Sequence, residues 1–226
     1  MYKIISCIFL LVGTLGSAQN DSIVDQKYLE DQIYVGFSYI ILNKPSEGVK
    51  QKGFSNNLSL GFIKDMPLNE RGNLAFGVGL GYGRNTYFQN IKIEKVDGNT
   101  QFSLLGGDVS YRSNKFSTHM IEAPLELRWR SSTIDKYKFW RIYGGAKFSY
   151  AFATNAKLKD DSGKLKTKGI DEINNFQYGL TFSVGYGTWN FNFYYGLSDV
   201  FEKAYLEDTT PLNTKDFRVG LIFYIL

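Results

Sequence analysis

The sequence is poor in the residues that metal proteins and many enzymes use. Its 226 residues include a single cysteine, Cys7, and a single histidine, His119. Because Cys7 lies in an N-terminal segment that we expect to be removed, the mature chain would have no disulfide, reactive thiol or cysteine-based metal site. One histidine also supplies too few ligands for an ordinary zinc centre. We therefore predict neither a metal nor any other cofactor.

Long apolar runs and blocks of like charge are also missing from most of the chain. After residue 18, no apolar segment approaches the roughly 20 residues that a membrane-spanning helix needs. The 26 basic and 22 acidic residues give a formal net charge of +4, and both signs are mixed along the polar segments. Without a concentrated basic block, nucleic acid is a poor candidate partner.

Glycine is common, and residues 73–83 (NLAFGVGLGYG) raise the question of a phosphate-binding loop. The dinucleotide fingerprint G-x-G-x-x-G does not fit, because Tyr82 and Arg84 stand where its third glycine would be. A repeat of two residues is instead typical of a β-strand, whose side chains alternate between two faces. One face of this strand would be apolar, and the other would carry Gly77, Gly79, Gly81 and Gly83.

The first 18 residues (MYKIISCIFLLVGTLGSA) have the features of a secretory signal peptide. Lys3 gives a positive start, residues 4–12 form a short apolar run, and residues 16–18 are small, as at a cleavage site. We expect export of the chain. The polar residues 19–31 would then form a short periplasmic leader ahead of one domain at 32–226.

Eight segments of this domain alternate apolar and polar residues over more than the five or six residues of an average strand. Short and long connections follow them in turn, the longest at 89–118 and 154–174. Long strands with short turns at one rim and long loops at the other are typical of outer-membrane barrels. The predicted strands are residues 32–42, 53–64, 73–88, 119–130, 138–153, 175–186, 189–198 and 215–226.

The tryptophans indicate which face of these strands meets lipid. There are three, Trp129, Trp140 and Trp189. All three lie in the apolar register and beside short turns, which is the arrangement of an aromatic girdle at a membrane interface. A soluble barrel would place its apolar register inside and would have no reason to align them. We predict an all-β fold, an eight-stranded antiparallel up-and-down transmembrane β-barrel in the bacterial outer membrane.

The opposite register would fill the narrow lumen with charge. Unpaired charges there would cost several kcal/mol each, so we expect cross-strand pairs. One hairpin register puts Glu126 opposite Arg141, and the next puts Glu122 opposite Lys147. The glycine row would leave room for bulky lumen side chains. The predicted charge network consists of Glu122, Glu126, Arg128, Arg130, Arg141, Lys147 and Arg218.

Other interpretations of these residues remain open from the sequence. The lumen charges could line a narrow ion path controlled by Glu126 and Arg128, and the glycine row could line a ligand cleft. A lipid-modifying enzyme centred on His119 would need a serine and an acid, such as Ser117 with Glu122 or Asp108. Spacing alone shows no such geometry, so we expect no enzyme. Residues 103–107 and 157–172 are candidate partner contacts in the loops.

Four segments carry a resemblance to a known family: GFIKDMPLNERGNLAFGVGLGYG (61–83), THMIEAPLELRWRSST (118–133), YKFWRIYGG (137–145) and VGLIFYIL (219–226). The chain resembles the PorT-like outer-membrane β-barrel family of Gram-negative bacteria, often labelled a porin family. The resemblance implies a small envelope barrel without catalytic residues, and the namesake implies an accessory role in protein secretion. The expected partners are outer-membrane lipid, lipopolysaccharide, and other envelope or secretion proteins.

Overall fold

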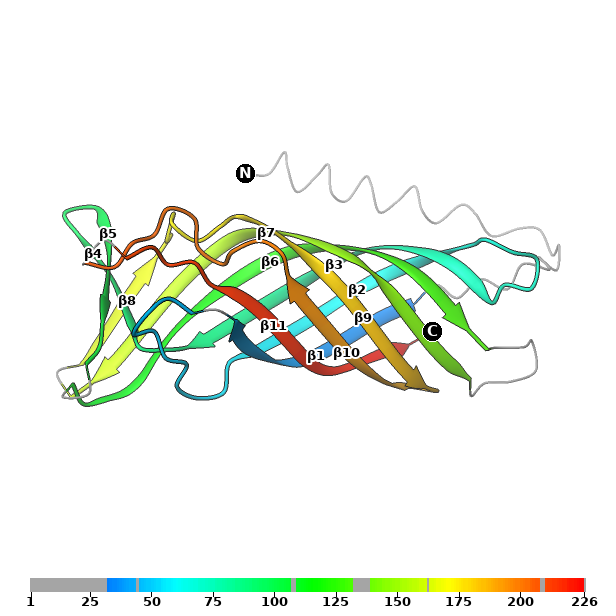
Figure 1. Ribbon diagram of the computed structural model, residues 1–226, viewed down its shortest axis with the longest axis horizontal. Helices are drawn as coiled ribbons and strands as arrows, with labels where there is room; N and C mark the ends of the chain where they lie inside the picture. The colour runs from blue at the N-terminus through cyan, green and yellow to red at the C-terminus, as the bar shows by residue number, and fades with distance from the viewer. Residues whose placement is uncertain are drawn as a thin grey trace, which may run out of the picture.

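Eight long strands form a closed antiparallel barrel in the computed structural model of the protein (Figure 1). The structure describes residues 32–43, 45–106, 109–131, 139–161, 163–207 and 210–225, so the expected signal peptide and leader lie outside it. The barrel strands pair with their neighbours in chain order, and β11 closes the wall against β1. They are β1 (Gln32–Asn43), β2 (Asn56–Pro67), β3 (Leu74–Phe88), β6 (Tyr111–Arg130), β7 (Trp140–Asp160), β9 (Phe176–Tyr186), β10 (Trp189–Gly196) and β11 (Lys215–Ile225).

This architecture confirms the predicted eight-stranded barrel, but the long connections hold more structure than the sequence analysis expects. They contain the short strands β4 (Ile91–Val96), β5 (Asn99–Leu104) and β8 (Lys164–Lys168). β4 and β5 form a hairpin whose turn residues, Asp97 and Gly98, both have positive φ, as a tight hairpin turn requires. β6 begins at Tyr111 instead of residue 119, and β7 continues to Asp160, so that β8 pairs with its residues 155–159.

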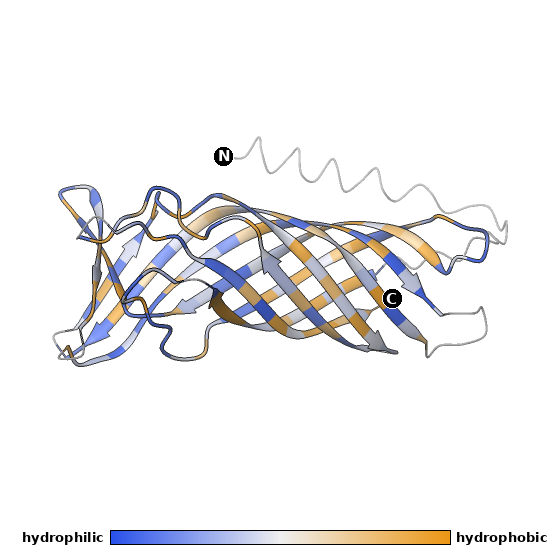
Figure 2. Cartoon of the chain, in the orientation of Figure 1, coloured by the Kyte–Doolittle hydropathy of each residue, from blue (hydrophilic) through white to orange (hydrophobic). Residues whose placement is uncertain are grey.

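The barrel has an apolar outside and a polar inside. Burial alternates along each strand, and the exposed register carries large apolar residues such as Leu80 and Phe191. Figure 2 shows the resulting orange bands around the middle of the barrel. Such a surface is stable only where lipid covers it. Among the described residues, no helix is long and apolar enough to cross a membrane.

Trp129, Trp140 and Trp189 all lie on this exposed register, at the end of the barrel that carries the short turns. Their side chains are 40%, 54% and 65% exposed. An indole ring is largely apolar yet has one N–H that donates a hydrogen bond, which suits the boundary between lipid and water. The three rings therefore mark one edge of the apolar belt.

We expect Val78→Arg to lower the free energy of unfolding by about 2–4 kcal/mol, because a guanidinium at mid-belt must enter lipid. Val78 lies in the middle of the exposed register of β3. Leu74→Arg, at the end of the same register, should cost about 0–1 kcal/mol because its charge reaches the interface. Urea unfolding in phospholipid vesicles measures both. Equal costs at the two positions would contradict the placement of the belt.

An apolar core lies beyond the apolar belt, at the end of the barrel opposite the short turns. We call this end the cap, formed by the described residues of 45–55, 88–118, 153–174 and 197–214 (Figure 1, left). Its buried side chains come from strand ends and loops distant in sequence, including Ile40, Phe116 and Phe201. Phe116 stacks on Tyr87 with ring centroids 4.5 Å apart. The cap is therefore a packed structure and not a set of separate loops.

Candidate functional site

A buried charge cluster fills the lumen near the short-turn end. Asp65 of β2 accepts hydrogen bonds from both Arg128 and Arg130 of β6, the latter at 2.8 Å between Nη1 and Oδ2. Arg128 also donates to Gln32, and its guanidinium lies 4.0 Å from the centre of the Tyr143 ring. Arg128 and Asp65 are both fully buried. Arg130 Nε also donates to the Gly72 carbonyl at 2.9 Å. Each arginine is thus held by a carboxylate and by neutral groups, as a buried guanidinium requires.

A second cluster lies deeper in the barrel, toward the cap. The Lys147 ammonium is 3.0 Å from Glu122 Oε2, and Arg218 Nη2 is 2.7 Å from Asp216 Oδ2. Arg218 Nη1 is also 3.8 Å from Glu122, so the two pairs form one network. The Tyr194 ring lies under the Arg218 guanidinium at 4.3 Å. These contacts link β6, β7 and β11 across the lumen and hold opposite walls together.

Between the clusters, the lumen is almost closed. The cavity there measures about 20 Å³ and is lined by Tyr34, Glu122, Glu126 and Lys147 among others. That volume corresponds to roughly one water-sized sphere. A hydrated ion or a small solute needs a wider path than this.

The hairpin of β6 and β7 adopts neither register expected from the sequence. Arg130 is opposite Arg141, which puts Glu126 opposite Gly145 and Glu122 opposite Ser149. The expected pair of Glu126 with Arg141 is therefore wrong. Glu122 still meets Lys147 because the two are diagonal neighbours on one face, within reach of a long side chain. Arg141 instead donates to the carbonyl of Gly187 in the turn after β9.

The glycine row of β3 lies on the lumen side and leaves space for its neighbours. A methyl group on Gly77 would lie 2.6 Å from Arg128, and one on Gly79 would lie 2.8 Å from Pro124. Gly81 and Gly83 are even closer to Tyr34 and Glu122. The row therefore lies directly against the side chains of the charge network. No larger residue fits there without moving them.

Several network members do not appear among the sequence candidates. Asp65 falls in a stretch interpreted as a turn, because the predicted second strand ends at residue 64 whereas β2 continues to Pro67. Asp216 stands two residues before Arg218 in one register of the last strand, a spacing that could have revealed it. Gln32 and Tyr34 carry no charge, so a search for opposite charges misses them. All four contact or line the lumen clusters.

The candidate hydrolase residues do not form a triad, although Ser117 and His119 line one hollow on the outer face. His119 lies on the outer face of β6, and its Nδ1 shares a hydrogen bond with the Tyr82 hydroxyl at 2.6 Å. Ser117 interacts with Thr86, while Glu122 points into the lumen, where it contacts Lys147. Asp108 lies outside the described residues. In the part of the chain that the structure covers, no three His, Cys, Asp or Glu side chains group as a metal site would require.

A closed eight-stranded wall with a lipid-facing belt and a charge-filled interior defines a small outer-membrane β-barrel. The chain belongs to the family described as outer membrane protein beta-barrel domain, whose model matches residues 17–202. Membership places the protein in the bacterial outer membrane, as predicted. The short turns therefore face the periplasm and the cap faces the exterior.

The solved structures that are similar to this chain at low identity include two of one protein. One is the crystal structure of Ail, the attachment invasion locus protein of Yersinia pestis, with 13% identity, a TM-score of 0.33, and coverage of 85% of this chain and 97% of that chain. The other is Ail in complex with the heparin analogue sucrose octasulfate, with 16% identity, a TM-score of 0.34, and coverage of 86% and 99%. No curated protein sequence matches the chain.

Proposed function

We propose that the protein is a non-enzymatic interaction barrel of the cell envelope, in which a sealed membrane anchor holds the cap at the outer surface. The closed lumen is the observation that carries this proposal. Two buried ion clusters fill the barrel, and the cavity between them measures about 20 Å³. Such an interior suits an anchor better than a transport path.

The structure of the cap supports a binding role. Ordering a long loop costs conformational entropy, which a barrel that serves only as an anchor could avoid with short turns. Here the connections instead form strands and a shared apolar core, as where the Thr167 hydroxyl donates to the Ile93 carbonyl at 2.9 Å. Rigid loops on a scaffold are common sites of recognition. Exposed apolar residues of the cap, such as Val109 and Tyr205, are available for contact.

The resemblance to the PorT-like family suggests a narrower form of this proposal, an accessory role in protein secretion. That role requires a secretion component in contact with the barrel or its cap. A photo-reactive residue at the exposed Tyr205 would identify such a component by cross-linking in intact cells.

Planar-bilayer recording of the refolded mature protein tests the sealed lumen. We expect the wild type to show no discrete openings, because the ion clusters leave no continuous aqueous path. Arg128→Ala should open a leak, since it removes a buried side chain that fills the lumen between Asp65 and Tyr143.

Arg112→Ala is the matched control, because Arg112 is exposed and its ion pair with Asp161 lies outside the lumen. It should stay as silent as the wild type. Discrete wild-type openings whose conductance changes in Arg128→Ala would contradict the proposal and identify a narrow channel.

A further inference from the structure

Basic side chains line the outer surface of the cap on β6, β7 and β8. Lys115 is directly opposite Lys157, which is directly opposite Lys166, so the three form one row across the sheet. Residues paired in this way point to the same face. The neighbouring rows on that face add further cations. We call this surface the basic face, formed by Arg84, Lys115, Lys157, Lys159, Lys164, Lys166 and Lys168.

The charges of the basic face lack compensation. Like charges directly opposite each other weaken strand pairing. The pKa of Lys157 is lowered, chiefly by the nearby charge of Lys159 and to a smaller extent by loss of contact with water. In the described part of the chain, no salt bridge involves a residue of this face. Asp161 at its far end is 3.6 Å from Arg112 instead. An anionic ligand would relieve this repulsion.

Two adjoining hollows give the face a shape suited to a ligand. One, of about 520 Å³, is lined by Arg84, Lys115, Lys157, Lys166 and Lys168 together with smaller residues. The other, of about 510 Å³, shares Ala153, Thr154 and Lys168 with it. The two hollows therefore lie next to each other on the side of the barrel, and we call them together the groove.

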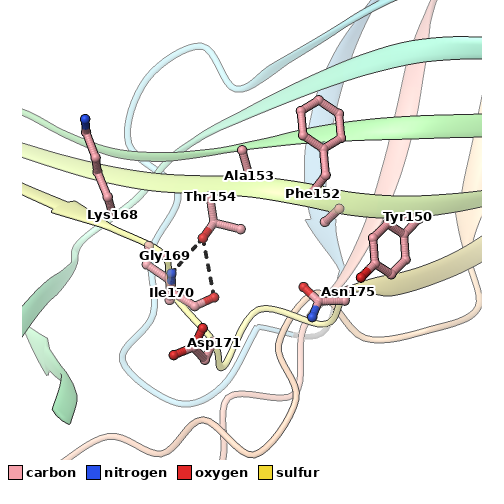
Figure 3. Close-up of a pocket in the computed structure, with 10 residues that line it drawn as sticks. Tyr150, Phe152, Ala153, Thr154, Lys168, Gly169, Ile170, Asp171 and Asn175 are labelled. Carbon is pink, nitrogen blue, oxygen red and sulfur yellow. Dashed lines mark hydrogen bonds between the residues drawn. The ribbon is translucent and has the colours of Figure 1, made fainter. Parts of the chain in front are cut away.

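The second hollow joins a cationic end to an aromatic end. Figure 3 shows Lys168 at one side and the rings of Tyr150 and Phe152 at the other. Between them, the Thr154 hydroxyl accepts a hydrogen bond from the Ile170 amide at 2.7 Å, which fixes the groove floor. Asp171 is the one carboxylate among the residues that line this hollow. A ligand that matches the groove is thus anionic at one end and apolar at the other.

The groove also lies at the depth of the lipid headgroups. Tyr150 and Phe152 lie on the lipid-facing register of β7, where they are 54% and 55% exposed. Along β3, Arg84 follows the lipid-facing Tyr82 by two residues, or about 7 Å at the usual rise of a strand. Cations begin where the belt ends, as expected for contact with an anionic membrane surface.

We propose that the basic face binds a phosphorylated glycolipid of the outer leaflet, with its phosphates among the lysines and an acyl chain along Tyr150 and Phe152. A soluble polyanion would satisfy the charge but would leave the aromatic end of the groove without a partner. The inference goes beyond the proposed function, because it concerns the side of the cap toward the membrane. It holds whether or not the lumen conducts.

Native mass spectrometry of the purified mature protein in detergent, titrated with diphosphorylated lipid A and with its dephosphorylated form, tests this site. We expect the wild type to retain the diphosphorylated form at least about tenfold more tightly. Lys115→Gln/Lys157→Gln/Lys166→Gln should lose about 100-fold in affinity for it, from the usual contribution of each cation near an anionic surface. Circular dichroism verifies that each variant is folded.

Lys50→Gln/Arg71→Gln/Lys203→Gln is the matched control, since it removes the same charge from exposed positions elsewhere. It should bind the lipid within about twofold of wild type. Tyr150→Ala/Phe152→Ala should weaken lipid binding but leave binding of heparin, a polyanion without acyl chains, unchanged. Equal affinity of the lysine variant and the wild type would overturn the proposal. So would heparin that binds the basic face as tightly as the lipid does.

Discussion

Asp65→Ala is expected to lower the free energy of unfolding by about 3–5 kcal/mol, because it removes the buried carboxylate that two buried guanidiniums share. Arg128 and Arg130 both hydrogen-bond to Asp65, and all three side chains are buried. Urea unfolding of the refolded protein, followed by tryptophan fluorescence, measures the loss.

Asp161→Ala provides the control, since it breaks an ion pair between exposed side chains that should be worth under about 1 kcal/mol. Removing the arginines together with the acid, as Asp65→Leu/Arg128→Met/Arg130→Met, should recover much of the stability lost in Asp65→Ala. Buried ion clusters can often be exchanged for apolar residues of similar volume. A cost for Asp65→Ala no larger than that for Asp161→Ala would show that the cluster does not hold the lumen together.

The barrel was predictable from the sequence because one physical requirement repeats along the whole chain. Lipid outside and a narrow lumen inside force an apolar residue at every second position of every strand. That pattern recurs eight times, and Trp129, Trp140 and Trp189 align at one rim, so the wall and its direction follow from the sequence. The structure and the family match agree on this wall.

The cap was not predictable in the same way. Its strands are short, and β8 (Lys164–Lys168) is so rich in lysine that its sequence is typical of a solvated loop. What makes it a strand is its pairing with β7 and the burial of Thr167 against Ile93. Such contacts join residues far apart in the chain, which a periodic pattern cannot show. The Asp97-Gly98 turn was the one local signal for a hairpin in this region.

The pairing within the lumen depended on a register that the sequence leaves open. Shifting a hairpin by two residues keeps every side chain on its face but changes each partner. The inward placement of Glu126 and Arg141 could thus be deduced, whereas their opposition could not. In the structure, Arg141 lies by the turn after β9 and Glu126 lies opposite a glycine. Asp65 takes the role of charge partner near the short-turn end.

The ion clusters in the lumen and the cap together determine where the basic face lies. The ion clusters brace the wall from within, and the cap covers the outer mouth with an apolar core of its own. A braced wall gives the cap a fixed position above the lipid. The basic face therefore stays at headgroup depth, where a phosphorylated lipid would meet it.

Gly81→Ala tests whether the glycine row serves packing, as its contacts indicate, or lines a ligand cleft. The new methyl group would collide with the Tyr34 hydroxyl and lie 2.7 Å from the Leu60 carbonyl. We expect a loss of about 1–3 kcal/mol in the free energy of unfolding, the usual cost of overpacking a filled interior. Gly144→Ala is the control on the lipid side, where the nearest atom is 3.9 Å away, and it should change stability by under about 1 kcal/mol.

Combining Gly81→Ala with Tyr34→Ala separates the two interpretations. If the methyl group and the phenol ring compete for one space, the double variant should be more stable than the sum of the single losses predicts, by about 0.5–3 kcal/mol. Part of the loss should persist, because the Leu60 carbonyl belongs to the backbone and remains in place. Strict additivity, or a Gly81→Ala variant as stable as the wild type, would contradict packing. The alternating glycines would then be better explained as the wall of a cleft kept clear for a ligand.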